Sequence, residues 1–209
     1  GGKACQARKQ RRRHVMNTLL LGCSDNDLKT AADLLRQGEV VAIPTETVYG
    51  LAANAYDDTA VRKVFAAKGR PCDNPLIVHI SNLDMIKDIA ADFPDIAKRC
   101  ADEFWPGPLT MILPKTDKIP LVTSGGLDTV GIRFPSNAVA NKIISLCGFP
   151  LAAPSANLSG SPSPTNAERV MQDMNTRISA VVDGCRCRIH RHILRRRRDK
   201  DTAAGRNII

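Results

Sequence analysis

Apolar residues recur along this chain with two different periods, and the two periods alternate. Residues 25–38 carry apolar side chains at helical spacing, with Asp25 or Asn26 as the expected N-cap and Gly38 as the stop. Further helices are predicted over residues 59–71, 137–148 and 166–174 and, in two pieces split near Pro94, over residues 83–105. Short apolar runs predict strands over residues 39–45, 75–80, 107–114, 129–135, 150–157 and 178–184. This alternation predicts an α/β fold with a mixed, twisted sheet flanked by helices.

Three polar segments lie at or near the ends of these strands, over residues 44–50, 68–75 and 154–163. Proteins of the α/β class usually place their ligands at the ends of strands. The functional site is therefore expected where these three segments meet.

Positive charge is concentrated at the two ends of the chain. The net charge is +9, of which residues 1–15 contribute +6 and residues 185–209 contribute +7, which leaves −4 for residues 16–184. The basic character belongs to the ends, so bulk charge does not favour a nucleic-acid interface on the body. We expect a basic extension over residues 1–15, one domain over 16–184 that starts at Met16, and an aberrant basic tail over 185–209.

The composition also bears on the compartment. No apolar run reaches the roughly 18 residues of a membrane span, and the short apolar stretch MNTLLLGC lacks a convincing cleavage site. Seven cysteines, an odd number mostly scattered singly, are typical of a reducing environment and not of a disulfide framework. A cytoplasmic protein without a membrane association is expected.

Two cations, Lys68 and Arg70, flank Gly69 at the end of the second predicted helix. They suit a polyphosphate, because lysine supplies a point charge and arginine a planar fork. They equally suit a cap at the negative end of the helix dipole. Neither a Walker loop nor a Rossmann fingerprint occurs in the chain.

Short polar side chains follow the strand predicted at residues 150–157, namely Ser155, Asn157, Ser159 and Ser163. They offer hydroxyl and amide groups to a ligand, although the composition alone favours an ordinary serine- and proline-rich loop. Thr45, Glu46 and Thr47 directly follow another strand, where local threonine hydrogen bonds are the alternative to a binding role.

His79 lies inside an apolar strand, where a lone histidine is more often a hydrogen-bonded core residue than a ligand. Arg133 also lies in a strand, and a buried arginine needs an anionic partner such as a substrate carboxylate or phosphate. Residues 16–184 contain no G-x-S-x-G elbow and no metal-spaced Cys/His set. Positioning and anion binding therefore favour adenylyl or phosphoryl transfer from a metal–nucleotide complex.

Five segments, taken in order, resemble the YrdC-like family of threonylcarbamoyl-AMP synthases. They are IPTETVYGL, KGRPCDNPLIVHI, FWPGPLTMIL, TVGIRFP and APSANLSGSPSPT, and together they cover roughly residues 25–184. The family mark is K-x-R followed far downstream by S-x-N, here Lys68, Arg70, Ser155 and Asn157. The resemblance implies a twisted mixed sheet around a large open cavity.

The resemblance also implies an activity. The substrates would be L-threonine, bicarbonate or CO2, and ATP with Mg2+, and the products threonylcarbamoyl-AMP and pyrophosphate. A partner enzyme complex would then transfer the threonylcarbamoyl group to adenosine 37 of tRNA. The alternative from another class is a non-catalytic module that binds double-stranded RNA or tRNA. Carbamoyl-phosphate chemistry is a third possibility, against which the absence of zinc-finger and acylphosphatase regions speaks.

The positions that match the family motif imply roles for individual residues. L-Threonine would contact Thr45, His79 and Arg133, with Arg133 taking the carboxylate. ATP would contact Lys68, Arg70, Asn74, Thr129, Ser155, Asn157 and Ser163. Lys68 and Arg70 would also act in catalysis by neutralising charge. No metal ligand is expected from the protein, since Mg2+ would arrive with the nucleotide.

The chain departs from the family pattern after Gly184. The family continues with a Glu-Ser-Thr-Val strand and an Ile-Leu-Arg-Pro-Gly segment, whereas this chain continues CRCRIHRHILRRRRDKDTAAGRNII. Permitted codons for residues 185–192, read one base later, give A-G-V-E-S-T-V. The same offset over residues 201–208 permits I-L-R-P-G-G-I. We hypothesise that residues from about 185 onward come from an out-of-frame reading.

This hypothesis changes what the tail is expected to do. The Cys-x-Cys and His-x-His pairs are then accidental, and the arginine run is not a dedicated RNA-binding tail. Residues 1–15 and about 186–209 are expected to be disordered. The missing Ser-Thr would line the threonine site and the missing Arg would approach ATP, so impaired activity is expected.

Overall fold

The computed structural model describes residues 17–184, which form one eight-stranded sheet and seven α-helices. The strands are β1 (Leu19–Leu21), β2 (Val41–Ile43), β3 (Gly50–Asn54), β4 (Ile77–His79), β5 (Thr110–Pro114), β6 (Thr129–Arg133), β7 (Leu151–Ala152) and β8 (Ala180–Val182). The helices are α1 (Asp25–Arg36), α2 (Asp58–Lys68), α3 (Ile86–Ile89), α4 (Asp95–Phe104), α5 (Leu121–Ser124), α6 (Ala138–Cys147) and α7 (Ala167–Met174).

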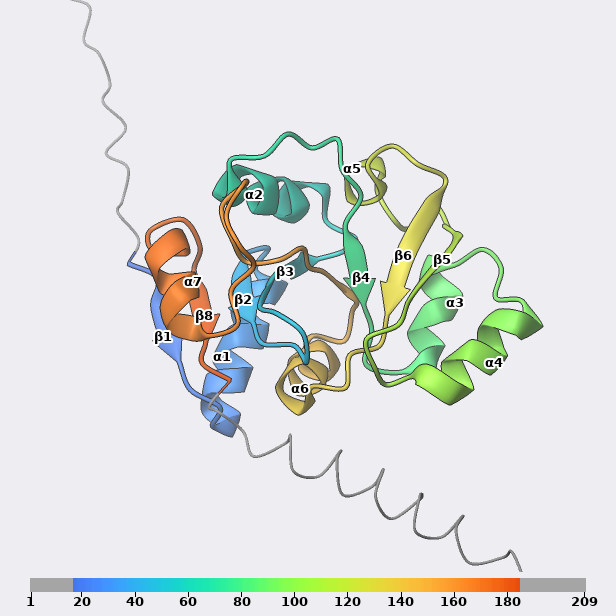
Figure 1. Cartoon of the computed structure of the whole chain (residues 1–209), viewed down its shortest axis with the longest axis horizontal. Helices are drawn as coiled ribbons and strands as arrows, with labels where there is room; N and C mark the ends of the chain where they lie inside the picture. The colour runs from blue at the N-terminus through green and yellow to red at the C-terminus, as the bar shows by residue number, and fades with distance from the viewer. Residues whose placement is uncertain (1–16, 185–209) are drawn as a thin grey trace, which may run out of the picture.

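The strands lie in the order β1-β8-β2-β3-β7-β4-β6-β5. β1 pairs parallel with β8, β8 with β2, and β4 with β6, while the other neighbours pair antiparallel. The first and last elements of the described chain therefore meet at one edge of the sheet, where β1, β8 and α7 lie together (Figure 1). The prediction of an α/β fold with a mixed sheet is confirmed.

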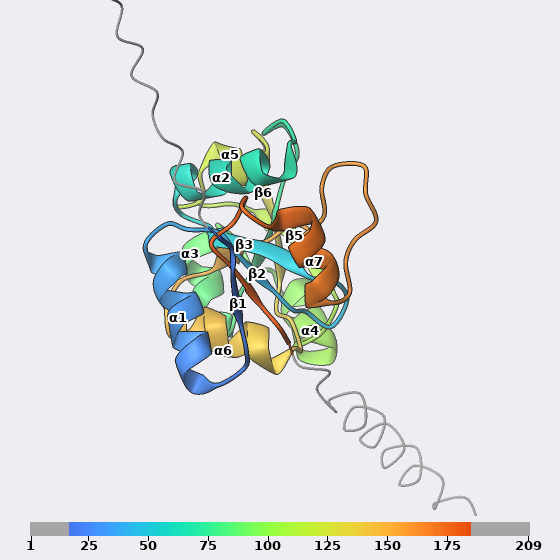
Figure 2. The ribbon, with the colours of Figure 1, turned by 90° about the vertical axis from the view of Figure 1, so that its left-hand side faces the viewer.

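The β1–β3 half of the sheet is covered by apolar helices on both faces. Alternate residues of β2, such as Val41 and Ile43, pack with α1 and α6, while Ala42 between them packs with α2 and α7. Figure 2 shows α1 and α6 on one side of these strands and α7 on the other. This half follows the rule that each face of a sheet buries its apolar side chains against another layer.

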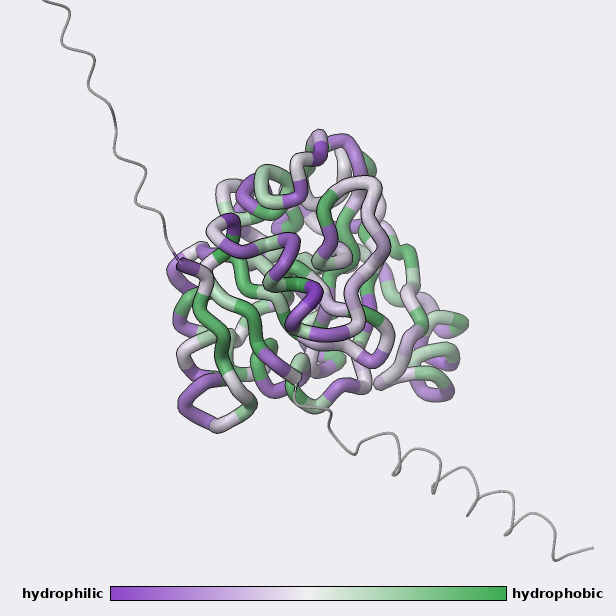
Figure 3. Tube along the Cα trace, turned by 60° about the vertical axis from the view of Figure 1, so that its left-hand side comes forward, coloured by the Kyte–Doolittle hydropathy of each residue, from purple (hydrophilic) through white to green (hydrophobic). Residues whose placement is uncertain are grey.

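In the β4–β6–β5 half of the sheet, only one face is buried under apolar side chains. Val78, Val130 and Ile132 are buried on that face in a cluster to which α3 and α4 contribute. The other face mixes polar and small residues with two isoleucines, Ile77 and Ile112, and Ile112 of the edge strand β5 is 73% exposed there. In the hydropathy view, hydrophobic stretches of the trace lie mostly in the interior and hydrophilic stretches mostly at the outer turns (Figure 3).

Local capping fixes the ends of α1, and one prediction about it is wrong. The N-cap is Ser24 and not Asp25 or Asn26, because the Ser24 hydroxyl accepts the Asp27 N–H at 3.2 Å and donates to the Asp27 carboxylate at 2.6 Å. Gly38, the predicted stop, follows the end of this helix in the left-handed region at φ +75°.

Most predicted elements are present, with shifted ends, and three present elements were not predicted. β1, β3 and α5 were missed, and the predicted helix near residue 83 begins as a 3₁₀ turn over Leu83–Met85. The expected start at Met16, the expected disorder of residues 1–15 and 186–209 and the out-of-frame tail all concern residues outside 17–184. Among the described residues, no helix is long and apolar enough to cross a membrane.

Candidate functional site

The polar face of β4 and β6 is set by strand alternation. In the parallel pairing, Ile77 lies opposite Gly131 and His79 opposite Arg133, so these four residues share one face. Their neighbours Val78 and Ile132 point to the opposite face and are buried there. The strands therefore hold the fold with one set of positions and present His79 and Arg133 with the other.

Gly131 leaves the middle of this face without a side chain. A Cβ atom at residue 131 would lie 3.3 Å from Thr110 Cγ2, closer than an ordinary van der Waals contact. The absence of a side chain leaves space between Arg133 and the start of β6.

Arg133 is only 8% exposed, and its anionic partner is a carboxylate of the protein itself. Its Nη2 atom lies 2.7 Å from Glu46 Oε1, and Nη1 and Nη2 donate to Thr47 Oγ1 at 3.2 and 3.3 Å. The sequence led us to expect a ligand as the partner. Glu46 and Thr47 were not among the predicted site residues, and their only signal was their position directly after β2.

The loop that carries Glu46 is held by the Thr45 hydroxyl. Thr45 Oγ1 accepts the N–H groups of Thr47 and Val48 at 3.2 and 3.3 Å and donates to the Val48 carbonyl at 2.6 Å. The local threonine hydrogen bonds considered for this segment are therefore present. They fix the turn that places Glu46 and Thr47 against Arg133.

His79 is buried, with 3% of its surface exposed, and its Nδ1 lies 3.2 Å from the Ile77 carbonyl. Burial lowers the pKa of His79 to about 4, and the nearby positive charge of Arg133 lowers it further in the same direction. The imidazole is therefore neutral near pH 7. His79 is therefore a buried, hydrogen-bonded residue of the core, and it also lies next to Arg133 at the candidate site.

Lys68 joins the end of α2 to the segment 155–157. Its Nζ donates to the carbonyl oxygens of Ser155 at 2.5 Å and Asn157 at 2.8 Å, and the Ser159 N–H donates to the Lys68 carbonyl at 3.1 Å. The helix itself ends on Gly69, in the left-handed region at φ +64°. The Lys68 ammonium thus reaches the S-x-N segment and does not cap its own helix.

The electrostatics of Lys68 are unusual for a lysine. The side chain is 3% exposed, and burial lowers its pKa to about 8, with a smaller lowering from the positive charge of Arg70. With a pKa of about 8, Lys68 is still mostly protonated at pH 7 and loses its proton in mildly alkaline solution. An anion placed beside Lys68 and Arg70 would stabilise the charged form.

The loop after β7 is tied to the loop after β2. Ser155 forms a β-bridge with Gly50, the Ala156 N–H donates to the Tyr49 carbonyl at 2.8 Å, and the Tyr49 N–H donates to the Pro164 carbonyl at 2.9 Å. Ser155 therefore joins the three polar segments: it pairs with Gly50 of segment 44–50 and accepts a hydrogen bond from Lys68 of segment 68–75.

Asn157 shapes its own loop. Its Nδ2 donates to the carbonyls of Leu158 at 2.8 Å and Ser161 at 2.7 Å, while its buried Oδ1 accepts no hydrogen bond from the described residues. Ser155 is half-buried and Ser163 is exposed. The amide of Asn157 is therefore partly used by the fold, and Ser163 lies on the surface of the loop.

Asn74 and Thr129 lie at the other end of β4 and β6 from His79 and Arg133. Both are half-buried; Asn74 precedes β4, and Thr129 is the first residue of β6. Thr129 and Arg133 are four positions apart along β6, which corresponds to about 13 Å. A ligand group beside Thr129 and another beside Arg133 would thus lie end to end along the strand.

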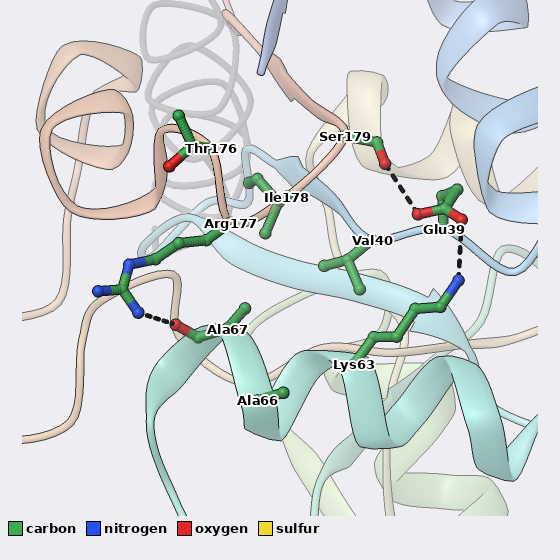
Figure 4. A pocket seen from close by; sticks show the side chains of 9 residues that line it. All are labelled: Glu39, Val40, Lys63, Ala66, Ala67, Thr176, Arg177, Ile178 and Ser179. Carbon is green, nitrogen blue, oxygen red and sulfur yellow. Dashed lines mark hydrogen bonds and ion pairs between the residues drawn. The ribbon is translucent and has the colours of Figure 1, made fainter. Parts of the chain in front are cut away.

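A cavity of about 350 Å³ lies elsewhere, between α2 and the segment 176–179 (Figure 4). None of the predicted site residues lines it. Its charges are matched within its wall, because Lys63 donates to Glu39 at 2.8 Å, Ser179 donates to the same carboxylate at 3.0 Å, and Arg177 donates to the Ala67 carbonyl. Since the residues predicted for the site lie elsewhere, the face of β4 and β6 that presents His79 and Arg133 is the candidate site.

No group of three or more His, Cys, Asp or Glu side chains within residues 17–184 could hold a metal ion. The groups gathered at the candidate site are instead cations, hydroxyls, amides and one carboxylate. Such groups suit the binding of anions and of an amino acid.

Comparison with known proteins identifies the family. The profile of the Sua5, YciO and YrdC proteins, described as "Telomere recombination", matches residues 33–193. This chain belongs to that family. The match includes all ten predicted site residues, from Thr45 to Ser163.

Relatives within the family carry a common name. Threonylcarbamoyl-AMP synthase of Pyrococcus abyssi is 51% identical over 162 residues, which are 78% of this chain and 48% of the relative. The protein of the same name from Bacillus subtilis is 51% identical over 177 residues, 84% of this chain and 51% of the relative. This chain thus spans about half the length of these curated relatives.

The fold is shared with a member of the family of known structure. The crystal structure of P. abyssi Sua5 complexed with L-threonine matches with a TM-score of 0.79 and 47% identity, covering 80% of this chain and 50% of that one. The YrdC-like fold predicted from the five segments is confirmed.

Proposed function

We propose that this chain is a threonylcarbamoyl-AMP synthase. It would form threonylcarbamoyl-AMP and pyrophosphate from L-threonine, bicarbonate or CO2, and Mg–ATP. Membership of the Sua5, YciO and YrdC family supports this activity, as do the names of relatives at 51% identity. Two observations carry the proposal: β4 and β6 present His79 and Arg133 on one face, and the Lys68 ammonium joins the end of α2 to the segment of Ser155 and Asn157.

The two ends of this face suit the two substrates. Arg133 and the neutral His79 lie side by side with the Thr45 turn, and we assign these three residues to L-threonine, with Arg133 on its carboxylate. The complex of the P. abyssi protein with L-threonine supports this choice of amino acid. We assign ATP to Lys68, Arg70, Asn74, Thr129, Ser155, Asn157 and Ser163.

The reaction needs alignment and charge neutralisation and no covalent enzyme intermediate. The neutral threonine amine forms a bond to the carbon of CO2 and releases a proton, which gives a carbamate; from bicarbonate, a water molecule leaves in place of the proton. A carbamate oxygen then attacks the α-phosphorus, the bond to the β-phosphate oxygen breaks, and pyrophosphate leaves. Lys68 and Arg70 neutralise the charge on the phosphates, with Mg2+ arriving as part of the nucleotide substrate.

Lys68 can keep its present partners in this reaction. Its ammonium is held by two carbonyl oxygens, and a phosphate oxygen would join them. A lysine has three N–H donors, and two are used here, which leaves one for a phosphate. Burial makes that one contact strong, since few water molecules screen it.

The wider context is proposed on the same basis. The product would pass to a threonylcarbamoyl transferase complex that modifies adenosine 37 of tRNA, and the protein would work in the cytoplasm. Cys72, Cys100 and Cys147 are free thiols, which suits a reducing compartment. The alternative of an RNA-binding module gains no support from a net charge of −4 over residues 16–184.

Pyrophosphate release tests the proposed activity. The purified chain should release pyrophosphate only when ATP, L-threonine and bicarbonate are all present. Lys68→Ala should lower the rate by roughly two to three orders of magnitude, as for other preorganised groups that stabilise transition-state charge. Arg62→Ala, on the exposed surface of the same helix, is the matched control and should keep the wild-type rate. Release without threonine, or a wild-type rate in Lys68→Ala, would contradict the proposal.

The out-of-frame tail needs a separate comparison. We propose that a chain with the restored Glu-Ser-Thr-Val and Ile-Leu-Arg-Pro-Gly segments is more active than the present one, because these segments would complete the threonine and ATP sites. The DNA that encodes residues 185–209 should contain both segments one base out of frame. An open frame that lacks them would remove this part of the proposal.

A further inference from the structure

Glu46 is a buried carboxylate with unused hydrogen-bonding capacity. Its side chain is 17% exposed, both of its oxygens are shielded from solvent, and neither makes a well-aligned hydrogen bond with the described residues. Its 2.7 Å contact with Arg133 is an ion pair without hydrogen-bond geometry. A carboxylate has room for about four donors, and buried polar atoms without partners are costly. The Glu46 carboxylate can therefore accept hydrogen bonds from a further donor.

Arg133 has spare capacity as well. Thr47 Oγ1 accepts from both Nη atoms, while the buried Nε–H makes no hydrogen bond to the described residues. Because this Nε and both Glu46 oxygens are closed to solvent, a group from outside can join the pair only when the surrounding side chains shift to open it. The threonine-rich turn around Thr45 holds Glu46 and Thr47 so that both face the guanidinium.

We propose that Glu46 binds the amino group of the amino-acid substrate while Arg133 binds its carboxylate. This inference rests on the proposed function and adds a residue and a specificity to it. An α-amino acid carries its amino and carboxylate groups on one carbon, so its two recognition groups must be neighbours. Glu46 and Arg133 are neighbours, and both Glu46 oxygens and the Arg133 Nε–H lack a hydrogen-bond partner among the described residues.

The chemistry of the first step agrees with this position. The amine attacks CO2 with its lone pair, so an acceptor on one of its N–H bonds turns the lone pair toward the carbon. The product carbamate keeps one N–H, which can still donate to Glu46. The released proton goes to solvent and not to Glu46. His79 and Arg133 lie side by side near Glu46, and His79 is neutral near pH 7. Of these two residues, only Arg133 carries a positive charge.

Ligand discrimination tests the inference. Calorimetry would compare L-threonine with (R)-3-hydroxybutyrate, which keeps the hydroxyl and carboxylate and lacks the amino group. Glu46→Gln should weaken L-threonine binding roughly tenfold to a hundredfold. The same change should leave the binding of (R)-3-hydroxybutyrate and of ATP nearly unchanged. Glu39→Gln, which changes a glutamate paired with Lys63 outside the site, is the matched control and should affect neither ligand.

Each other outcome has a distinct meaning. Tighter binding of both acids by Glu46→Gln would show that Glu46 competes with the substrate carboxylate, and this would overturn the inference. Equal weakening of both acids would show that Glu46 only supports Arg133, and it would overturn the inference too. Failure of the unaltered protein to bind L-threonine would remove the proposed function itself, whereas lost discrimination alone leaves that function standing.

Discussion

The two halves of the sheet are built on the same alternation but use it differently. In the β1–β3 half, both sets of alternating positions are apolar, and helices cover both faces. In the β4–β6–β5 half, Val78 and Ile132 bury one face while His79 and Arg133 occupy the other. The difference shows how one strand can serve stability and binding at once, with the two tasks assigned to successive residues.

The largest effect expected from this division concerns Ile132, the residue next to Arg133. Ile132→Ala should lower the free energy of unfolding by about 2–5 kcal/mol, because it removes fully buried methyl groups from a packed cluster. Urea denaturation measures this loss. L-Threonine affinity, measured on the folded fraction, should stay within a few-fold of wild type. A large loss of affinity with little loss of stability would show that the two faces are not separate.

A smaller effect concerns His79, which is buried on the polar face. Its pKa is about 4 in the folded protein and about 6.5 when unfolded, so the unfolded chain takes up the proton first as the pH falls. Stability from this group is complete above pH 6.5 and is lost between pH 6.5 and 4, by at most about 3 kcal/mol. Unfolding free energies of wild type and His79→Gln across this range should differ in slope. If the unfolding free energies of the two proteins change in parallel with pH, the lowered pKa of His79 is contradicted.

The sequence predicted those elements in which apolar residues recur with a clear helical or strand period within the element itself. The spacing of Leu28, Ala31, Ala32 and Leu35 predicted α1, and these residues are buried as expected. β3 was missed because its sequence, GLAAN, consists of small residues with weak strand preference. Its place in the sheet comes from pairing with β2 and β7, which no local pattern reports.

The candidate site was predictable only in part, for a similar reason. Lys68 and the segment of Ser155 and Asn157 were grouped by the family motif, and the structure joins them through two hydrogen bonds. Glu46 had no such signal, since its partner Arg133 lies far along the chain. The Lys68 ammonium also faces carbonyl oxygens that are part of the backbone, and no side-chain pattern reveals them.

Binding of the two substrates to separate ends of one face is the central claim, and calorimetry on two variants tests it most directly. Lys68→Ala should lose ATP affinity and keep L-threonine affinity. Arg133→Lys should do the reverse, because it keeps a charge beside Glu46 but loses the planar fork for a carboxylate. If each folded variant loses both ligands equally, or keeps both, then the two ends of the face do not divide the substrates as proposed.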